Sequence, residues 1–192
     1  MDRDVQNPEY WKTRLYEASE AHEPHRALYI TDRDTWANLE MYHRGILAHH
    51  IKPGDRILDA GCGWGRLLTL LPTSWYTQVG QGHSGTHRSG YRGNYYGIDI
   101  SPDFIAKAKE TNANQIMVQF QVGSLLELPK HWEREGFKEF DWAIAIAVRS
   151  MITNYVGKDV WEAMQRNILE VSKRLLVLSY DFDTYEVIEC EK

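Results

Sequence analysis

The chain has 192 residues and a formal net charge of −5, with 22 Lys and Arg against 27 Asp and Glu. Hydrophobic residues make up 43% and charged residues 26%, which excludes an intrinsically disordered or low-complexity chain. No run approaches the roughly 18–20 apolar residues of a membrane span, and the opening residues do not form a signal peptide. We therefore expect one soluble, cytoplasmic globular domain over residues 1–192.

Neither the charge nor the cysteines point to nucleic acid, a disulfide framework or a metal. The sequence has no stripe of basic residues of the kind that a phosphate backbone demands, so nucleic acid is not the expected partner. Cys62 and Cys190 are far apart and form no CxxC pair, a pattern typical of a reducing compartment. His83 and His87 have the spacing of a metal pair but no further ligands, and we expect no metal.

Short apolar runs alternate with helical patterns along the chain, which is typical of a parallel sheet covered by helices. The N-terminal arm, residues 1–34, is predicted to contain a short helix and an irregular segment. The predicted helices are 35–51, 64–71, 102–111 and 157–173. The predicted strands are 56–60, 95–100, 116–122, 141–148 and 175–180, with one further short strand at 185–190. Ser101 followed by Pro102 and Asp103 marks the start of the helix at 102–111.

Residues 73–93 interrupt this pattern, because 11 of the 21 are Gly, Ser or Thr. Such a segment has too few apolar side chains to bury itself, so we predict a flexible insertion. It follows a helix and precedes a strand, which places it at the amino edge of the sheet. Ligands of open α/β sheets bind at the carboxyl edge, so we expect no catalytic role for the insertion.

The most informative stretch is LDAGCGWGR at residues 58–66. A glycine-rich turn after a strand lets a ligand approach the backbone and the N–H groups of the next helix. A dinucleotide-binding turn would have glycine at position 66, where Arg66 stands, and the preceding Asp59 would repel a pyrophosphate. S-adenosylmethionine has a cationic ammonium and no phosphate, which suits Asp59. Asp99, at the end of the second predicted strand, has the position of a carboxylate that binds ribose hydroxyls.

The chain resembles the class I (Rossmann-like) S-adenosylmethionine-dependent methyltransferases over residues 36–180. LDAGCGWGRLL is similar to the first family motif and YYGIDIS to the second. The resemblance implies an α/β fold: a three-layer Rossmann-like sheet of mostly parallel strands flanked by helices. It also implies that Asp59 contacts the cofactor's ammonium and Asp99 its ribose. The other cofactor-binding residues implied in the turn and at the strand ends are Gly61, Cys62, Gly63, Gly65, Ile100, Ser124, Leu125 and Ala147.

The N-terminal arm and the C-terminal end are less regular than the central motifs. Trp11 and Arg14 are similar to the aromatic–arginine opening of several small-molecule methyltransferases, which implies contacts with the sulfonium and with the cofactor carboxylate. The alternative is a surface helix whose Tyr10 and Trp11 pack on the core. Gly123 and Ser124 stand where many relatives have Gly-Asp, so the acid that binds adenine is missing, and the Ser124 hydroxyl and the Leu125 N–H remain to bind the base. Twelve residues after Tyr180 cannot supply the last helix and hairpin, so the sheet is shortened relative to the seven-stranded family fold unless a second subunit completes it.

The sequence does not identify the catalytic residue. Arg149 and Tyr180 are the candidates we single out, beside others at the carboxyl edge and in the arm: Ser150, Tyr155, Asp181, His25 and Tyr29. The motifs of methyltransferases that act on nucleic-acid bases are absent after the fourth predicted strand.

We therefore expect an enzyme that transfers a methyl group from S-adenosyl-L-methionine to O, N or S of a small molecule, leaving S-adenosyl-L-homocysteine. The alternatives are a protein or peptide methyltransferase and a non-catalytic S-adenosylmethionine-binding module. A homo-oligomer is compatible with the sequence. An NAD-dependent oxidoreductase is opposed by Asp59 and Arg66.

Overall fold

The computed structural model describes residues 5–20, 32–71, 95–115, 118–128, 139–179 and 185–190. The predicted insertion at 73–93 lies outside these residues, as do four catalytic candidates: His25, Tyr29, Tyr180 and Asp181. Within the described part of the chain, no helix is long and apolar enough to cross a membrane.

The centre of the fold is a six-stranded sheet with the order β3-β2-β1-β4-β5-β6. Its strands are β1 (Ile57–Ala60), β2 (Tyr95–Asp99), β3 (Val118–Val122), β4 (Trp142–Ile146), β5 (Arg174–Leu178) and β6 (Tyr185–Glu189). The first five are parallel, and β6 runs antiparallel to β5. The sequence order reverses on the two sides of β1, and ligands of open α/β sheets bind at such a switch point. The predicted α/β sheet of mostly parallel strands is confirmed.

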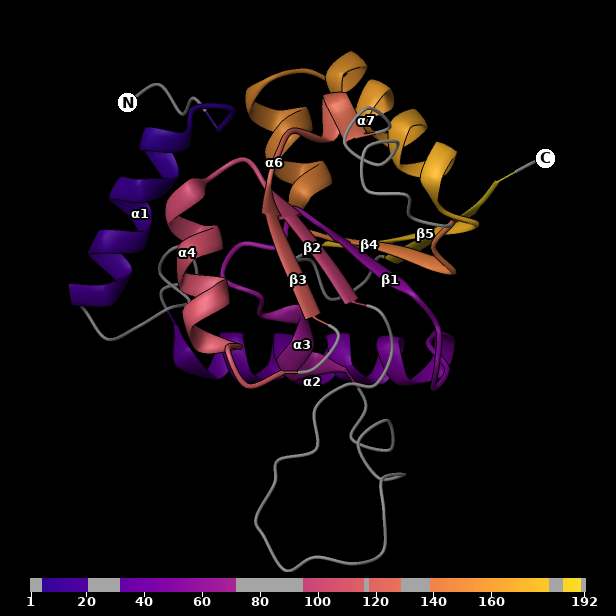
Figure 1. Cartoon of the computed structure of the whole chain (residues 1–192), viewed down its shortest axis with the longest axis horizontal. Coiled ribbons are helices and arrows are strands. Elements are labelled where there is room, and N and C mark those ends of the chain that lie inside the picture. The colour runs from indigo at the N-terminus through magenta and orange to yellow at the C-terminus, as the bar shows by residue number, and fades with distance from the viewer. Residues whose placement is uncertain are drawn as a thin grey trace, which may run out of the picture.

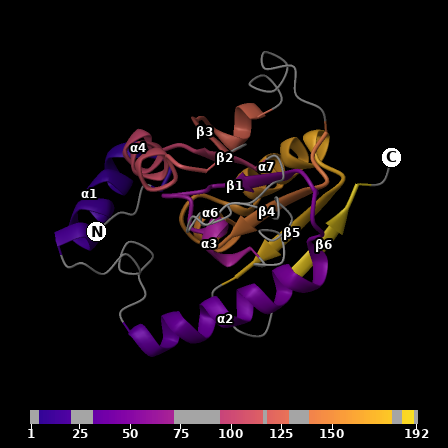
Figure 2. The same ribbon diagram turned by 60° about the horizontal axis from the view of Figure 1, so that its bottom comes forward.

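Helices cover both faces of the sheet and give the predicted three layers (Figures 1 and 2). The lower layer in Figure 1 contains α2 (Arg33–His50) and α3 (Leu67–Leu70), and the upper layer contains α6 (Val148–Tyr155) and α7 (Lys158–Val171). At the β3 end, α4 (Pro102–Thr111) lies beside α1 (Pro8–Glu20). A short 3-10 helix, η3 (Leu125–Glu127), follows β3.

The local chemistry of the helix starts explains two of these boundaries. The Ser101 hydroxyl accepts a hydrogen bond from the Phe104 N–H at 3.3 Å, and Pro102 is the first residue of α4. This arrangement confirms the predicted start of the helix. Asp32 caps α2 in the same way, accepting from the Thr35 N–H at 2.7 Å.

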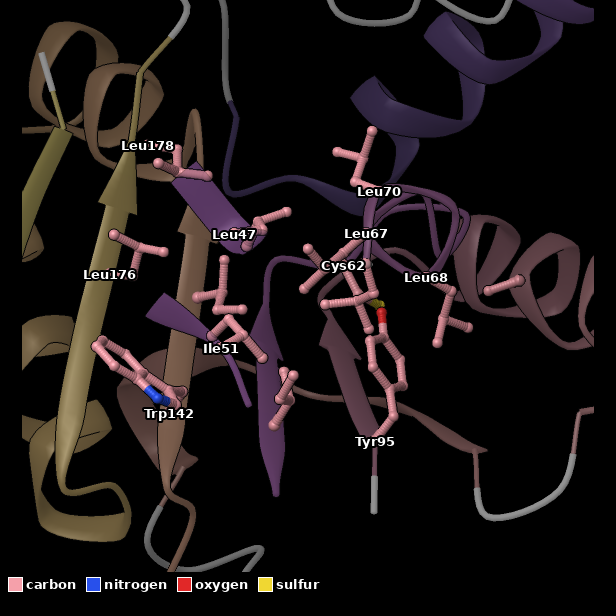
Figure 3. Packing of buried hydrophobic residues seen from close by; sticks show 14 of the residues in the cluster. Leu47, Ile51, Cys62, Leu67, Leu68, Leu70, Tyr95, Trp142, Leu176 and Leu178 are labelled. Atoms are coloured by element: carbon pink, nitrogen blue, oxygen red, sulfur yellow. The ribbon is translucent and has the colours of Figure 1, made fainter. Parts of the chain in front are cut away.

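Alternate strand residues pack on opposite faces of the sheet. On β1, Ile57 packs on the face covered by α2 and α3, whereas Leu58 belongs to the cluster on the face covered by α6 and α7. Figure 3 shows the first cluster, in which leucines of α2 and α3 meet Leu176 and Leu178 of β5. Tyr95 is buried in this cluster and its ring points towards α3 beside Cys62. A sheet buried on both faces explains why its strands read as continuous apolar runs.

Two predicted elements were wrong in their extent. The helix predicted over 64–71 is a turn up to Arg66, and only Leu67–Leu70 is helical. Gly65 has φ +82°, a left-handed conformation that a helix cannot contain. The strand predicted over 141–148 ends at Ile146, because Ala147 has φ +62° and Val148 begins α6. The sequence analysis therefore missed α6.

Candidate cofactor-binding site

A main cavity opens at the carboxyl ends of β1, β2 and β4, where the sheet topology predicts a ligand site. Its volume is about 880 Å³ including its open mouth. A second, smaller cavity of about 350 Å³ adjoins it. The residues that line both cavities are Gly61, Gly63, Trp64 and Ile146. The two cavities therefore adjoin at the glycine-rich turn.

The turn after β1 is held against the neighbouring strand by its own backbone. The N–H groups of Gly61 and Cys62 both donate to the carbonyl oxygen of Ile98, at 2.9 and 3.0 Å. Gly61 has φ +77°, and a Cβ atom at this position would lie 2.6 Å from Cγ2 of Val148. Gly61 is therefore required both by the backbone conformation and by the close approach of α6.

Gly63 differs from Gly61 because the space beside it is open. It has φ +51°, and a Cβ atom built on it would meet no atom within 4 Å. Since Gly63 lines both cavities, the missing side chain leaves room for a ligand to approach the turn closely. This is the fit that a ligand bound along the backbone of the turn requires.

Gly65 and Cys62, two other predicted binding residues, lie deeper than the mouth of the cavity. Gly65 lines neither cavity, and a Cβ atom there would lie 2.9 Å from the ring of Phe120, so packing explains the glycine. Cys62 lines the second cavity and is buried. Burial raises the pKa of its thiol well above the ordinary value, so the thiol stays neutral.

Asp99 at the end of β2 lies in the wall of the main cavity. Its carboxylate accepts hydrogen bonds from the Gly63 N–H and the Ser101 N–H, both at 2.9 Å. Burial raises the pKa of this carboxyl, and the backbone hydrogen bonds oppose that rise. Asp99 thus joins the glycine turn to the start of α4 and leaves further lone pairs for a ligand.

Asp59 at the end of β1 is buried in the wall of the second cavity, with 3% of its surface exposed. It accepts a hydrogen bond from the Tyr95 hydroxyl. Burial raises the pKa of Asp59 from 3.8 to about 7, while Tyr95 and the nearby Arg66 guanidinium act in the opposite direction. A cationic group placed beside Asp59 would favour its ionised form.

The remaining wall of the main cavity contains most of the other predicted residues. Ile100, Ser124, Leu125 and Ala147 all line it. The Ser124 hydroxyl accepts from the Leu126 N–H at 3.2 Å, and the Ala147 N–H donates to the Leu178 carbonyl at 2.7 Å. The sequence analysis missed further lining residues: Val5, Gln6, Phe104, Met151 and Met164.

The N-terminal segment lies over the main cavity. Trp11 lines the cavity, and its indole N–H donates to the Val5 carbonyl oxygen at 2.9 Å. The ring of Trp11 also lies 5.9 Å from that of Phe104 on α4. Trp11 therefore packs on the core and also lines the cavity, while its contact with the cofactor's sulfonium stays a prediction. Arg14 lines neither of the two cavities.

The catalytic candidates on α6 line neither of the two cavities. Arg149 forms an ion pair with Glu186 of β6, and about half of each side chain is exposed. Ser150 donates to the Ala147 carbonyl at 3.0 Å, and Tyr155 is exposed. Among the described residues, no three His, Cys, Asp or Glu side chains are grouped to hold a metal ion.

Comparisons with known proteins identify the family. A family model described as a methyltransferase domain matches residues 51–181, which is more than half of the chain. Curated proteins give no match. Phosphoethanolamine N-methyltransferase 1 of Haemonchus contortus, solved with phosphoethanolamine and S-adenosylhomocysteine, is similar with a TM-score of 0.55. It is 15% identical over 92% of this chain and 33% of its own.

A TehB-like S-adenosylmethionine-dependent methyltransferase from Corynebacterium glutamicum has a TM-score of 0.48 and 20% identity, over 88% of this chain and 71% of its own. The YcgJ protein of Bacillus subtilis has a TM-score of 0.49 and 18% identity, over 71% of this chain and 49% of its own. This chain thus spans a third of the H. contortus enzyme and half of the B. subtilis protein. The chain therefore belongs to the methyltransferase domain family and is a methyltransferase of the Rossmann-like α/β fold.

Proposed function

We propose that this enzyme binds S-adenosylmethionine in the main cavity and transfers its methyl group to an oxygen, nitrogen or sulfur atom of a small molecule. The observation that carries the proposal is the position and lining of this cavity. It lies at the carboxyl edge of the sheet, between the glycine-rich turn, Asp99 and Trp11.

The residues present fit this cofactor. The open space beside Gly63 admits a ligand along the turn, and Asp99 offers carboxylate lone pairs to ribose hydroxyls. Ile100 and Leu125 supply apolar surface for a flat base. Asp59, behind the turn, is a carboxyl group suited to a cationic ammonium. When bound, the cofactor supplies a methyl group that its sulfonium has already activated for in-line displacement.

In this proposal the residues of the chain orient the reactants and exclude water. The aromatic face of Trp11 in the cavity wall stabilises a nearby positive charge. Among the described residues that line the main cavity, Asp99 is the only one with an acidic or basic side chain. Two backbone N–H groups hold its carboxylate in place. The proposal therefore needs no general base, and it favours acceptor atoms with a free lone pair at neutral pH.

The N-terminal segment supports a small acceptor. Val5 is buried, and its carbonyl is fixed by the indole N–H of Trp11. These residues cover part of the main cavity, which leaves less access for the surface of a folded protein than for a free small molecule.

The test is methyl transfer from isotopically labelled S-adenosylmethionine to a panel of small amines, phenols and thiols, with a pool of peptides alongside. We expect label in at least one small molecule, and slower transfer to the same acceptor by the Asp99→Ala variant when the cofactor is well below saturation. Transfer to peptides alone would favour the protein methyltransferase instead. Cofactor binding without transfer to either class would contradict the proposal.

A further inference from the structure

The second cavity brings together a buried cation and a buried carboxyl group. Arg66 and Asp59 both line it, and only 8% and 3% of their surfaces are exposed. The other lining residues are uncharged: Gly61, Cys62, Gly63, Trp64, Leu67 and Ile146. Burying a charge is costly unless a counter-charge is near, so two opposite charges in one small cavity are suited to a zwitterion.

Side chains of α2 hold the Arg66 guanidinium beside this cavity. The guanidinium carbon lies 4.6 Å from the centre of the Trp36 ring, and Nη1 lies 4.0 Å from Oε1 of Glu40. Stacking on an aromatic face fixes the plane of the guanidinium, whose N–H donors form a fork that matches the geometry of a carboxylate. The ion pair with Glu40 is at the limit of contact distance, and Glu40 is itself a quarter exposed.

The place of Arg66 in the chain also points to a ligand of the glycine-rich turn. It directly follows Gly65 and precedes α3, so its backbone belongs to the same turn at which the two cavities adjoin. A nucleoside beside Asp99 in the main cavity would extend its tail past Gly61 and Gly63, which line both cavities. The tail would then reach the second cavity, where Arg66 and Asp59 lie.

We propose, on the basis of the cofactor site described above, that Arg66 binds the carboxylate of the cofactor's amino-acid end while Asp59 receives its ammonium. The resemblance to small-molecule methyltransferases implies Arg14 for this carboxylate, but Arg14 lines neither of the two cavities. Arg66 is thus a binding residue of the cofactor, and the side chains of Trp36 and Glu40 orient it.

The test compares two ligands by calorimetric titration. S-adenosylhomocysteine has the amino-acid end, whereas 5′-methylthioadenosine keeps the nucleoside and the sulfur and lacks that end. We expect Arg66→Gln to weaken S-adenosylhomocysteine binding about 10- to 100-fold and to leave 5′-methylthioadenosine binding unchanged. Arg66→Lys should restore part of the loss, because it keeps the charge without the fork of donors.

The matched control is Arg44→Gln, an exposed arginine on α2, which should change neither affinity. An equal loss of both ligands in Arg66→Gln would show a structural role and overturn the inference, as would unchanged binding of both. Failure of the wild-type protein to bind either ligand would overturn the cofactor site itself.

A second experiment needs no variant and so does not depend on how well Arg66→Gln folds. The methyl ester of S-adenosylhomocysteine lacks the negative charge and keeps the ammonium. We expect the wild-type protein to bind the ester about 10- to 100-fold more weakly than the acid. Equal affinity for acid and ester would overturn the role of Arg66.

Discussion

Asp59→Asn should make the ligand-free enzyme more stable at neutral and alkaline pH. Burial raises the pKa of Asp59 from 3.8 to about 7 in the folded protein. The folded state therefore holds a proton more tightly than the unfolded state, and stability falls as pH rises from about 4 to about 7. Asparagine keeps an oxygen that accepts from the Tyr95 hydroxyl and has no charge to bury.

The magnitude follows from the difference of about three pH units between the two pKa values, at about 1.4 kcal/mol each. The buried Asp59 should lower the free energy of unfolding by about 4 kcal/mol at pH 8 and by less than about 2 kcal/mol at pH 5. The gain in unfolding free energy of Asp59→Asn over wild type should therefore grow by about 2–3 kcal/mol between these pH values.

The assay is urea denaturation of both proteins at pH 5, 6, 7 and 8. Asp34→Asn, an exposed position in the first turn of α2, is the matched control and should show no growing gain. A gain for Asp59→Asn that is independent of pH, or that shrinks as pH rises, would refute the reasoning from burial.

Four further substitutions test other parts of the structure. His43→Gln should reduce the fall in unfolding free energy below pH 6.5, because burial lowers the pKa of His43 to about 4 and charging the folded protein's imidazole costs about 3 kcal/mol. Acid denaturation of the variant and the wild type measures this difference. Identical acid curves would contradict the prediction. Gly61→Ala should destabilise by more than about 1 kcal/mol, since its Cβ would lie 2.6 Å from Val148. Gly45→Ala, exposed within α2, should instead stabilise by about 0.5–1 kcal/mol, and thermal unfolding that ranks the two glycines alike would refute the packing argument. Asp99→Ala should weaken cofactor binding by about 1.5–3 kcal/mol, as measured by calorimetry, and an unchanged affinity would rule out its contact with the ribose.

Much of the fold could be predicted because local chemistry specifies it. Both faces of the sheet are buried, so β1, β2 and β4 appear in the sequence as apolar runs. The Ser101–Pro102 start of α4 needs no tertiary contact to be recognised. The glycine turn and the acids at the ends of β1 and β2 could be placed at one edge of the sheet, because the carboxyl ends of parallel strands meet there.

The missed features depend on tertiary contacts. The start of α6 has no capping side chain, and its first residue, Val148, continues the apolar pattern of β4. The change from strand to helix occurs at Ala147, which has a positive φ. Alanine rarely adopts this conformation, so the residue type does not indicate the turn. The Val5 carbonyl oxygen accepts from the indole N–H of Trp11, six positions later. The Arg66 guanidinium lies over the ring of Trp36, on a helix 30 positions earlier.

The proposed function depends above all on the cavity at the carboxyl edge binding an S-adenosyl cofactor. The most direct measurement is a calorimetric titration of the wild-type protein with S-adenosylhomocysteine, with NAD in a parallel titration. We expect S-adenosylhomocysteine to bind and NAD not to bind, because Arg66 stands where a dinucleotide-binding turn has glycine and the Asp59 carboxylate would repel a pyrophosphate. Binding of NAD alone, or of neither ligand, would contradict it.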